Sequence, residues 1–232
     1  MLLLSAFAVA QPVYNRYPNS TNYAISSGSA VLAGASFFLQ RSVQPLTIAE
    51  LPALEQQQFT GLQAWSTRQW SVPAAHASDV FLLGSAVLPA AIFLFEDGRM
   101  EAHRHVHMYA QTAFLNYAVT ALTKSLVKRN RPFVHNADVP LSTRLHPDAR
   151  MSFFSGHTST VASFSFFTAS VVSSYSDRAG VRWAAWSAAA LIPAVTGYLR
   201  MRAGKHYFSD VVVGYAAGAA IGVAVPLVHR GR

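Results

Sequence analysis

Residues 211–228 read Val-Val-Val-Gly-Tyr-Ala-Ala-Gly-Ala-Ala-Ile-Gly-Val-Ala-Val-Pro-Leu-Val, a stretch without Asp, Glu, Lys or Arg. A helix that crosses the hydrocarbon core of a bilayer needs about 17–25 largely apolar residues, and this stretch is long enough. Its small residues, concentrated in Gly214–Gly222, allow a neighbouring helix to approach closely in lipid. The stretch therefore predicts a membrane-spanning helix that packs tightly against another helix.

Five further uncharged stretches precede it: Tyr17–Gln40, Val80–Phe95, Val106–Thr123, Ser152–Ser176 and Trp183–Leu199. The second is short for a span, and the first is diluted by the polar run Ser26-Ser27-Gly28-Ser29. Buried helices of a large soluble core would give the same pattern, but six in one short chain favour a membrane. We therefore predict an all-α fold, a polytopic transmembrane bundle of about six helices.

The composition indicates a membrane protein with anionic partners. Of the 232 residues, 52% are hydrophobic and only 12% are charged, against about 25% charged in an ordinary soluble domain. This composition excludes intrinsic disorder and disfavours a soluble globule. The net charge of +8 favours nucleic acid, anionic lipid or a phosphorylated substrate. The absence of cysteine excludes disulfides, a thiolate nucleophile and cysteine-based zinc sites.

The N-terminal residues 1–10 have the pattern of a secretory signal that ends in the small-x-small motif Ala8-Val9-Ala10. The basic residues expected before such a segment are missing, so an uncleaved apolar segment is the alternative. We predict that residues 11–232 form one domain.

The polar segment Arg41–Asp79 contains Thr47-Ile48-Ala49-Glu50, which has the spacing of a capping box. One interpretation is a short amphipathic helix at the membrane surface, with Trp65 and Trp70 as interfacial aromatics. An ordinary connecting loop, favoured by Pro52, is the other.

Three polar clusters at the ends of the uncharged stretches carry the candidate chemistry. The first contains Lys124 and Arg131, followed by Pro132. Seven positions correspond to about 700° of helix rotation, so both side chains would share a face if the helix continued to Pro132. A lysine point charge beside an arginine fork suits a phosphate group. A basic membrane flank would have the same composition.

The second cluster, Ser152–Ser159, contains Ser155-Gly156-His157 at the start of an uncharged stretch. Gly156 lets the backbone approach a ligand, and the first amides of the following helix would face an anion with the positive end of the helix dipole. His157 could donate a proton to a leaving group near neutral pH. A loop histidine beside a helix cap is the structural alternative.

The third cluster, Arg200–Asp210, joins the fifth and sixth stretches. If the sixth helix begins there, His206 and Asp210 stand four residues apart on one face. The carboxylate could then fix the tautomer of the imidazole and leave its other nitrogen free to attack. An ion pair that caps the last helix is the alternative.

In order and spacing, the three clusters resemble the tripartite signature of the type 2 phosphatidic acid phosphatase superfamily, which includes bacterial acid phosphatases and vanadium haloperoxidases. The similarity covers residues 124–210, and the flanking stretches are similar to its bacterial integral-membrane branch. Phe154 stands where that family usually has proline, and Leu199 where it usually has serine. The resemblance implies a phosphatidic acid phosphatase/haloperoxidase-like helical core.

The resemblance also implies a role for each residue. His206 would be the nucleophile that takes the phosphoryl group, Asp210 would orient it, and His157 would protonate the leaving alcohol and later activate water. The phosphoryl oxygens would be held by five residues: Lys124, Arg131, Ser155, Gly156 and Arg200. Phosphoryl transfer depends mainly on positioning and electrostatic stabilisation, which these cations and a helix N-terminus can supply. We therefore expect no metal and no cofactor.

These observations predict a membrane-embedded lipid phosphatase that hydrolyses a phosphomonoester or pyrophosphate of a lipid through a phosphohistidine. Its partners would be membrane lipids and not nucleic acid, and its oligomeric state stays open. The resemblance implies a multi-pass protein of the bacterial inner membrane with a periplasmic site. A lipid phosphotransferase, a non-catalytic protein that binds phospholipid headgroups and, less favoured, a vanadate-dependent halide-oxidising enzyme are the alternatives.

Two groups of titratable residues are given no function. His103, His105 and His107 alternate, but only the first and last would share a helix face, so we expect a solvated turn and not a zinc site. Asp79 and Glu96 flank the second uncharged stretch, and we expect them to mark its ends.

Overall fold

The structure is a computed structural model that describes Tyr14 and residues 20–230. The predicted signal segment, residues 1–10, lies outside the described residues. Within the described ranges every regular element is a helix, and one isolated antiparallel bridge joins Tyr14 to Arg230. The predicted all-α fold is confirmed.

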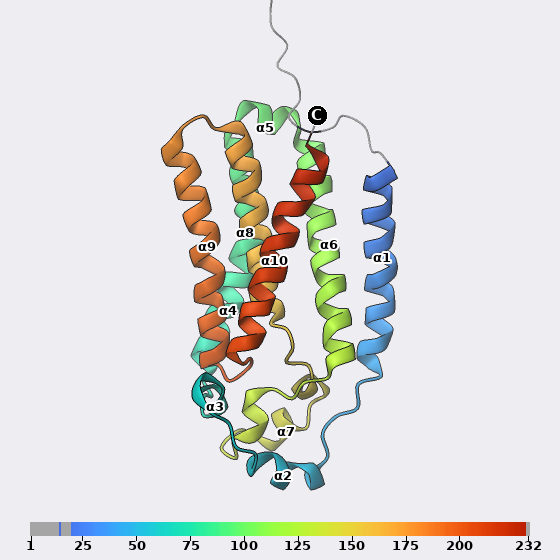
Figure 1. Cartoon of the computed structure of the whole chain (residues 1–232), viewed down its shortest axis with the longest axis vertical. Coiled ribbons are helices and arrows are strands. Elements are labelled where there is room, and N and C mark those ends of the chain that lie inside the picture. Colours follow the sequence, from blue (N-terminus) through green and yellow to red (C-terminus); the bar gives the residue numbers. More distant parts are fainter. Residues whose placement is uncertain (1–13, 15–19, 231–232) are drawn as a thin grey trace, which may run out of the picture.

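Six long helices in the described part of the chain run alongside one another (Figure 1). They are α1 (Ser20–Arg41), α4 (Val72–Ser85), α6 (Ala102–Val127), α8 (Gly156–Tyr175), α9 (Ala179–Arg202) and α10 (Phe208–His229). The 3-10 helix η2 (Leu88–Leu94) continues α4. Each uncharged stretch overlaps one of these helices, and Val80–Phe95 runs from α4 into η2. A backbone in lipid must satisfy its hydrogen bonds within its own segment, which favours helices at these positions.

In the part of the chain that the structure describes, two segments are long and apolar enough to cross a membrane by length and composition, Val72–Leu94 and Phe208–His229. The second contains residues 211–228, on which the membrane prediction rests. The first is longer than the uncharged stretch within it, because α4 begins at Val72, before Asp79. Serine and threonine reduce the hydropathy of α8, but none of these side chains is exposed: four of the nine are buried and five are half-buried.

The predicted close helix contact is formed between α10 and α8. Along α10, the residues Gly214, Gly218 and Gly222 lie directly against the backbone of α8. A Cβ atom built on Gly218 would lie 2.1 Å from the carbonyl oxygen of Ser159, and contacts below 3 Å would also arise at Gly214 and Gly222. We call this contact the glycine seam. No larger side chain fits in it without moving one helix away from the other.

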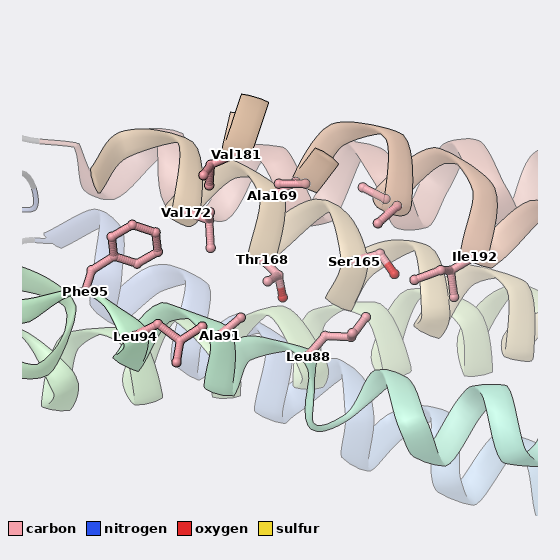
Figure 2. A pocket seen from close by; sticks show the side chains of 13 residues that line it. Leu88, Ala91, Leu94, Phe95, Ser165, Thr168, Ala169, Val172, Val181 and Ile192 are labelled. Atoms are coloured by element: carbon pink, nitrogen blue, oxygen red, sulfur yellow. The ribbon is translucent and has the colours of Figure 1, made fainter. Parts of the chain in front are cut away.

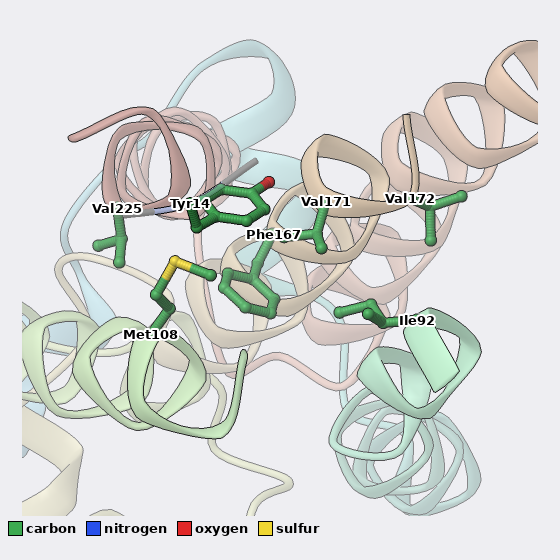
Figure 3. Packing of buried hydrophobic residues seen from close by; sticks show 7 residues of the cluster. All are labelled: Tyr14, Ile92, Met108, Phe167, Val171, Val172 and Val225. Carbon is green, nitrogen blue, oxygen red and sulfur yellow. The ribbon is translucent and has the colours of Figure 1, made fainter. Parts of the chain in front are cut away.

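The apolar interior lies towards the end of the bundle where α8 meets α9. An apolar cavity of about 260 Å³ separates η2 from α8 and α9, and Leu88, Phe95 and Val172 are among its lining residues (Figure 2). Beside it, buried side chains from η2, α6, α8 and α10 form one apolar cluster together with Tyr14 (Figure 3). They are Ile92, Met108, Phe167, Val171, Val172 and Val225.

A layer of short helices closes the opposite end, at the bottom of Figure 1. We call it the end layer. It comprises η1 (Ile48–Glu50), α2 (Leu51–Glu55), α3 (Gly61–Thr67), η3 (Pro132–His135), α7 (Leu141–Arg144) and η4 (Pro147–Arg150). Its own apolar core consists of Leu46, Phe133, Val134, Val139 and Ala149.

The segment Arg41–Asp79 contributes several short helices to this layer, where one amphipathic helix or a loop was expected. The expected cap is present, since the Thr47 backbone N–H donates to Glu50 Oε2 at 2.8 Å, but it begins only the 3-10 turn η1. The ring of Trp70 packs against Phe133, with 5.7 Å between centroids. Trp70 is therefore part of the end layer's packing.

The histidine pattern at residues 103–107 does not form the solvated turn that we expected. These residues belong to α6, and His105 is buried, with its Nε2 2.9 Å from the hydroxyl of Tyr175. The described residues contain no group of three or more His, Cys, Asp or Glu side chains that could hold a metal ion.

Candidate active site

A cavity of about 330 Å³ lies where the bundle meets the end layer. Six of the eight predicted site residues line it: Lys124, Arg131, Gly156, His157, Arg200 and His206. The other two, Ser155 and Asp210, are fully buried and lie outside its lining. Residues from three separate parts of the sequence therefore meet at one place.

Lys124 and Arg131 reach this cavity by a route that differs from the predicted one. Helix α6 ends at Val127, because Lys128 adopts a left-handed conformation with φ 48°. Arg131 is extended, as expected for a residue before proline. The prediction of a shared helix face is therefore wrong. The loop folds back instead, and the backbone N–H of Arg131 donates to the carbonyl of Ala149 at 2.8 Å.

The side chain of Arg131 is buried, and each of its three guanidinium nitrogens donates a hydrogen bond. Its Nε donates to the carbonyl of Asp148 at 2.9 Å, and its Nη2 pairs with Asp148 Oδ1 at 2.7 Å. Its Nη1 donates to the carbonyl of Lys205 at 3.0 Å and lies 3.2 Å from His206 Nε2. Burial raises the pKa of Asp148, but the Arg131 guanidinium outweighs burial and holds that pKa below its usual value. The guanidinium is thus fixed beside the imidazole of His206.

His206 lies in the loop before α10, since that helix begins at Phe208. Gly204, with φ 68°, turns this loop onto the end layer; a Cβ atom there would lie 2.1 Å from the carbonyl oxygen of Gln69. A guanidinium only donates hydrogen bonds, so His206 Nε2 is the acceptor from Arg131 and the neutral ring carries its proton on Nδ1. Burial, followed by the nearby cations, keeps the pKa of His206 well below its usual value. The ring is therefore neutral near pH 7, with a lone pair on Nε2.

Asp210 lies close to His206 but is engaged mainly by other groups. The distance from His206 Nδ1 to Asp210 Oδ2 is 3.6 Å, which is too long for a hydrogen bond. Asp210 Oδ2 accepts from Ser152 Oγ at 2.6 Å and from the Tyr207 backbone N–H at 3.0 Å. Its Oδ1 accepts from Arg129 Nη1 at 2.6 Å. Sequence reasoning missed this role of Arg129, whose only signal was its position within the first basic cluster.

The Ser155-Gly156-His157 motif forms the start of α8, as predicted. Ser155 is the N-cap, and its Oγ accepts from the Thr158 backbone N–H at 3.4 Å. Gly156 leaves room for Lys124, whose Cε would lie 3.6 Å from a Cβ atom at that position. The Lys124 ammonium donates to the carbonyl of Met151 at 2.6 Å. A cation therefore lies directly beside the N-terminus of α8. The two positive groups together favour the binding of an anion at this position.

His157 forms a hydrogen bond with Asp79, which we expected only to mark the end of an uncharged stretch. Its Nε2 lies 2.8 Å from Oδ1 of Asp79, which stands in the middle of α4. The same carboxylate oxygen lies 3.7 Å from Nη1 of Arg200. Nothing in the local sequence around Asp79 indicated this contact, because its partners are far away along the chain.

A second, polar cavity of about 250 Å³ lies within the end layer, and Asp148 and Lys205 line it. Asp148 also lines the first cavity, so the two cavities meet at this carboxylate. Burial, then Arg131 and Arg200, lower the pKa of Lys205 to about 8.

The fold is that of a superfamily of membrane phosphatases. The profile of the PAP2 superfamily matches residues 106–232, more than half of the chain, and the chain belongs to this superfamily. The predicted family is thereby confirmed. No match was found among curated proteins.

Among solved structures, the fold is similar to the crystal structure of the first transmembrane PAP2 type phosphatidylglycerolphosphate phosphatase from Bacillus subtilis. The TM-score is 0.52 at 17% sequence identity, and the alignment covers 89% of this chain and 94% of that chain. At this identity the similarity establishes the fold, which is that of a transmembrane PAP2 protein.

Proposed function

We propose that this protein is a lipid phosphatase that works through a covalent phosphohistidine and needs no metal. The observation that carries the proposal is the meeting of two histidines with three cations in one cavity. His206 would be the nucleophile and His157 the general acid and base. Lys124, Arg131 and Arg200 would hold the phosphoryl oxygens, together with Ser155 and the backbone amide of Gly156.

The first half of the reaction forms the phosphohistidine. Arg131 now donates to Nε2 of His206, and the phosphoryl oxygens of a bound substrate would take over that donor and free the lone pair. Nε2 then attacks phosphorus, the bond from phosphorus to the lipid oxygen breaks, and His157 gives its proton to that oxygen. In the second half, His157 takes a proton from water, the water oxygen attacks phosphorus, and the bond to Nε2 breaks to release inorganic phosphate.

Asp210 would stabilise the ring of His206 while it carries positive charge. Nδ1 of His206, which carries the proton of the neutral ring, lies 3.6 Å from Asp210 Oδ2. Catalytic hydrogen bonds are often long in the absence of substrate and tighten in the complex. The fixed position of Asp210, which accepts hydrogen bonds from three other groups, supports this role.

A lipid substrate is supported by the position of the cavity. Gln40 of α1 and Tyr117 of α6 line its bundle side, so a phosphate held at His206 would leave its organic part among the helices. The Bacillus subtilis relative, whose name describes a phosphatidylglycerolphosphate phosphatase, supports a phosphorylated lipid. The substrate class proposed is a phosphomonoester or pyrophosphate of a lipid.

The purified protein in detergent is expected to release inorganic phosphate from at least one member of a panel of lipid phosphates and lipid diphosphates. Excess EDTA should leave the rate unchanged, because three cationic side chains and a helix N-terminus neutralise the phosphoryl charge. A magnesium-dependent phosphatase in the same buffer serves as the control for chelation. Complete loss of activity that a divalent ion restores would contradict the metal-free mechanism, and no phosphate release from any member would contradict the function.

We further propose a multi-pass protein of the bacterial inner membrane whose active-site end faces the periplasm, in keeping with the family resemblance. The chain has no cysteine, so single cysteines can be labelled without background. In cells with a permeabilised outer membrane, an impermeant maleimide should label Ala137→Cys in the exposed part of the end layer. It should not label Asp177→Cys in the exposed loop between α8 and α9. The reverse pattern would contradict a periplasmic site.

A further inference from the structure

Helix α4 brings two neighbouring residues to the active site, although neither belongs to the three sequence clusters. Asp79 Oδ1 lies 2.8 Å from His157 Nε2 and 3.7 Å from Arg200 Nη1. Ser78, which is completely buried, accepts a hydrogen bond from the same Arg200 Nη1 at 3.2 Å. The side chain of His157 is 25% exposed and lines the cavity, whereas that of Asp79 is 50% exposed and lies beside His157, outside the lining. Helix α4 is thereby tied to the site through two adjacent side chains.

We propose that Asp79 is a positioning residue that fixes His157 in the orientation and tautomer required of a general acid. This inference rests on the proposed function of His157.

The chemistry of the pair determines which nitrogen of His157 handles the substrate's proton. A carboxylate oxygen accepts hydrogen bonds, so Nε2 of His157 carries a proton and donates a hydrogen bond to Asp79. The other nitrogen, Nδ1, is then the one that exchanges a proton with the reacting groups. When His157 is protonated, Nδ1–H passes its proton to the oxygen of the leaving alcohol, and the ring becomes neutral while Nε2 keeps its proton.

Asp79 also stabilises the charged form of the ring before that transfer. The Arg200 guanidinium on the same side of His157 disfavours a second positive charge, and a carboxylate at 2.8 Å offsets this effect. Asp79 acts only as a hydrogen-bond acceptor in this role, as in other pairs where a carboxylate orients a catalytic imidazole. Its removal should therefore reduce the supply of protons to the leaving group and not the binding of phosphate.

Two routes of action have to be distinguished, because Asp79 contacts Arg200 as well as His157. If Asp79 acted through Arg200, its removal would weaken the stabilisation of the phosphoryl oxygens. Every phosphomonoester has these oxygens, so all substrates would be affected equally. A role through His157 would depend on the leaving group. An alkoxide of a lipid alcohol must be protonated as it departs, whereas a nitrophenolate departs without a proton.

The test compares Asp79→Asn with the wild-type protein on two substrates, an alkyl lipid phosphate and p-nitrophenyl phosphate. General acid catalysis contributes about 10²–10⁴-fold, so the variant is expected to lose about 10²-fold in kcat/KM on the alkyl phosphate, because kcat/KM reports the steps up to departure of the leaving group and not the later hydrolysis of the phosphohistidine. On p-nitrophenyl phosphate it should keep nearly the full kcat/KM. In a His157→Ala background, Asp79→Asn should cause no further loss, because two residues that act as one unit are not additive.

Asp177→Asn, the same chemical change at an exposed residue between α8 and α9, is the matched control and should behave as wild type. An equal loss on both substrates, an unchanged rate on the alkyl phosphate, or a full further loss in the His157→Ala background would each overturn the positioning role. Wild-type protein that hydrolyses neither substrate would overturn the proposed function, and with it this inference. The two kinds of failure are therefore distinguishable.

Discussion

Replacement of His206 by alanine is expected to lower kcat for lipid phosphate hydrolysis by about 10⁴-fold or more, because a hydrolase without its nucleophile loses nearly all of its acceleration. His206 is 1% exposed, and its Nε2 faces the cavity beside Arg131. The other histidine in the lining, His157, is held by Asp79 and cannot take its place. The initial rate of phosphate release measures the effect. Trapping with labelled substrate should give a protein-bound phosphate that is stable in base and lost in acid, and the variant should lack it.

His229→Ala is the matched control for the removal of a buried imidazole. His229 is 5% exposed and lies at the other end of α10, with Nδ1 2.8 Å from the carbonyl oxygen of Val225. This variant should retain most of its activity even if its thermal stability falls. Equal phosphate release from wild type and His206→Ala would remove the phosphohistidine mechanism.

The second large effect is expected for Arg131→Lys, which should lower kcat/KM by about 10²–10³-fold, the usual cost of removing one preorganised donor to a transition-state oxyanion. All three nitrogens of the guanidinium are engaged, two of them by Asp148. A lysine ammonium is a point charge and cannot reproduce that planar fork. The ammonium of the introduced lysine would therefore lie away from the position of the phosphoryl oxygens that the Arg131 guanidinium would contact beside His206.

Arg144→Lys provides a close control in the end layer. Arg144 is as buried as Arg131, at 5% exposure, and it also pairs with a partly exposed carboxylate, that of Glu55. It does not line the active-site cavity. A loss of activity for Arg144→Lys as large as that for Arg131→Lys would mean that the arginine substitutions act through the stability of the end layer. Thermal unfolding of both variants in detergent measures that contribution.

The fold was largely predictable because the constraint that a bilayer imposes is visible in composition. An uncharged run such as residues 211–228 has to form a helix in lipid, and its glycines have to face another backbone. The end layer was less predictable. Its helices have only three to seven residues, and they depend on contacts such as that of Trp70 with Phe133, which are distant in sequence.

Within the site, the residue types and their order were predictable, whereas part of the local geometry was not. The prediction for Lys124 and Arg131 assumed a continuous helix, and the left-handed Lys128 ends it first. Asp79 was assigned no function because its bond to His157 joins residues 78 positions apart. A pattern read along the chain carries no information about such a contact.

The glycine seam has a mechanical consequence for the two histidines. His157 begins α8 and His206 directly precedes α10, so each stands at the end of a helix that forms the seam. The two helices are in direct backbone contact along the glycine seam, so a change of side-chain rotamer cannot alter the distance between them. Close-packed protein interiors also have low compressibility. Helix α1 lies at the edge of the bundle against α6 and adds only Gln40 to the cavity. We therefore expect thinning or lateral compression of the bilayer to act on the cavity wall at α1 and to leave the separation of the two imidazoles unchanged.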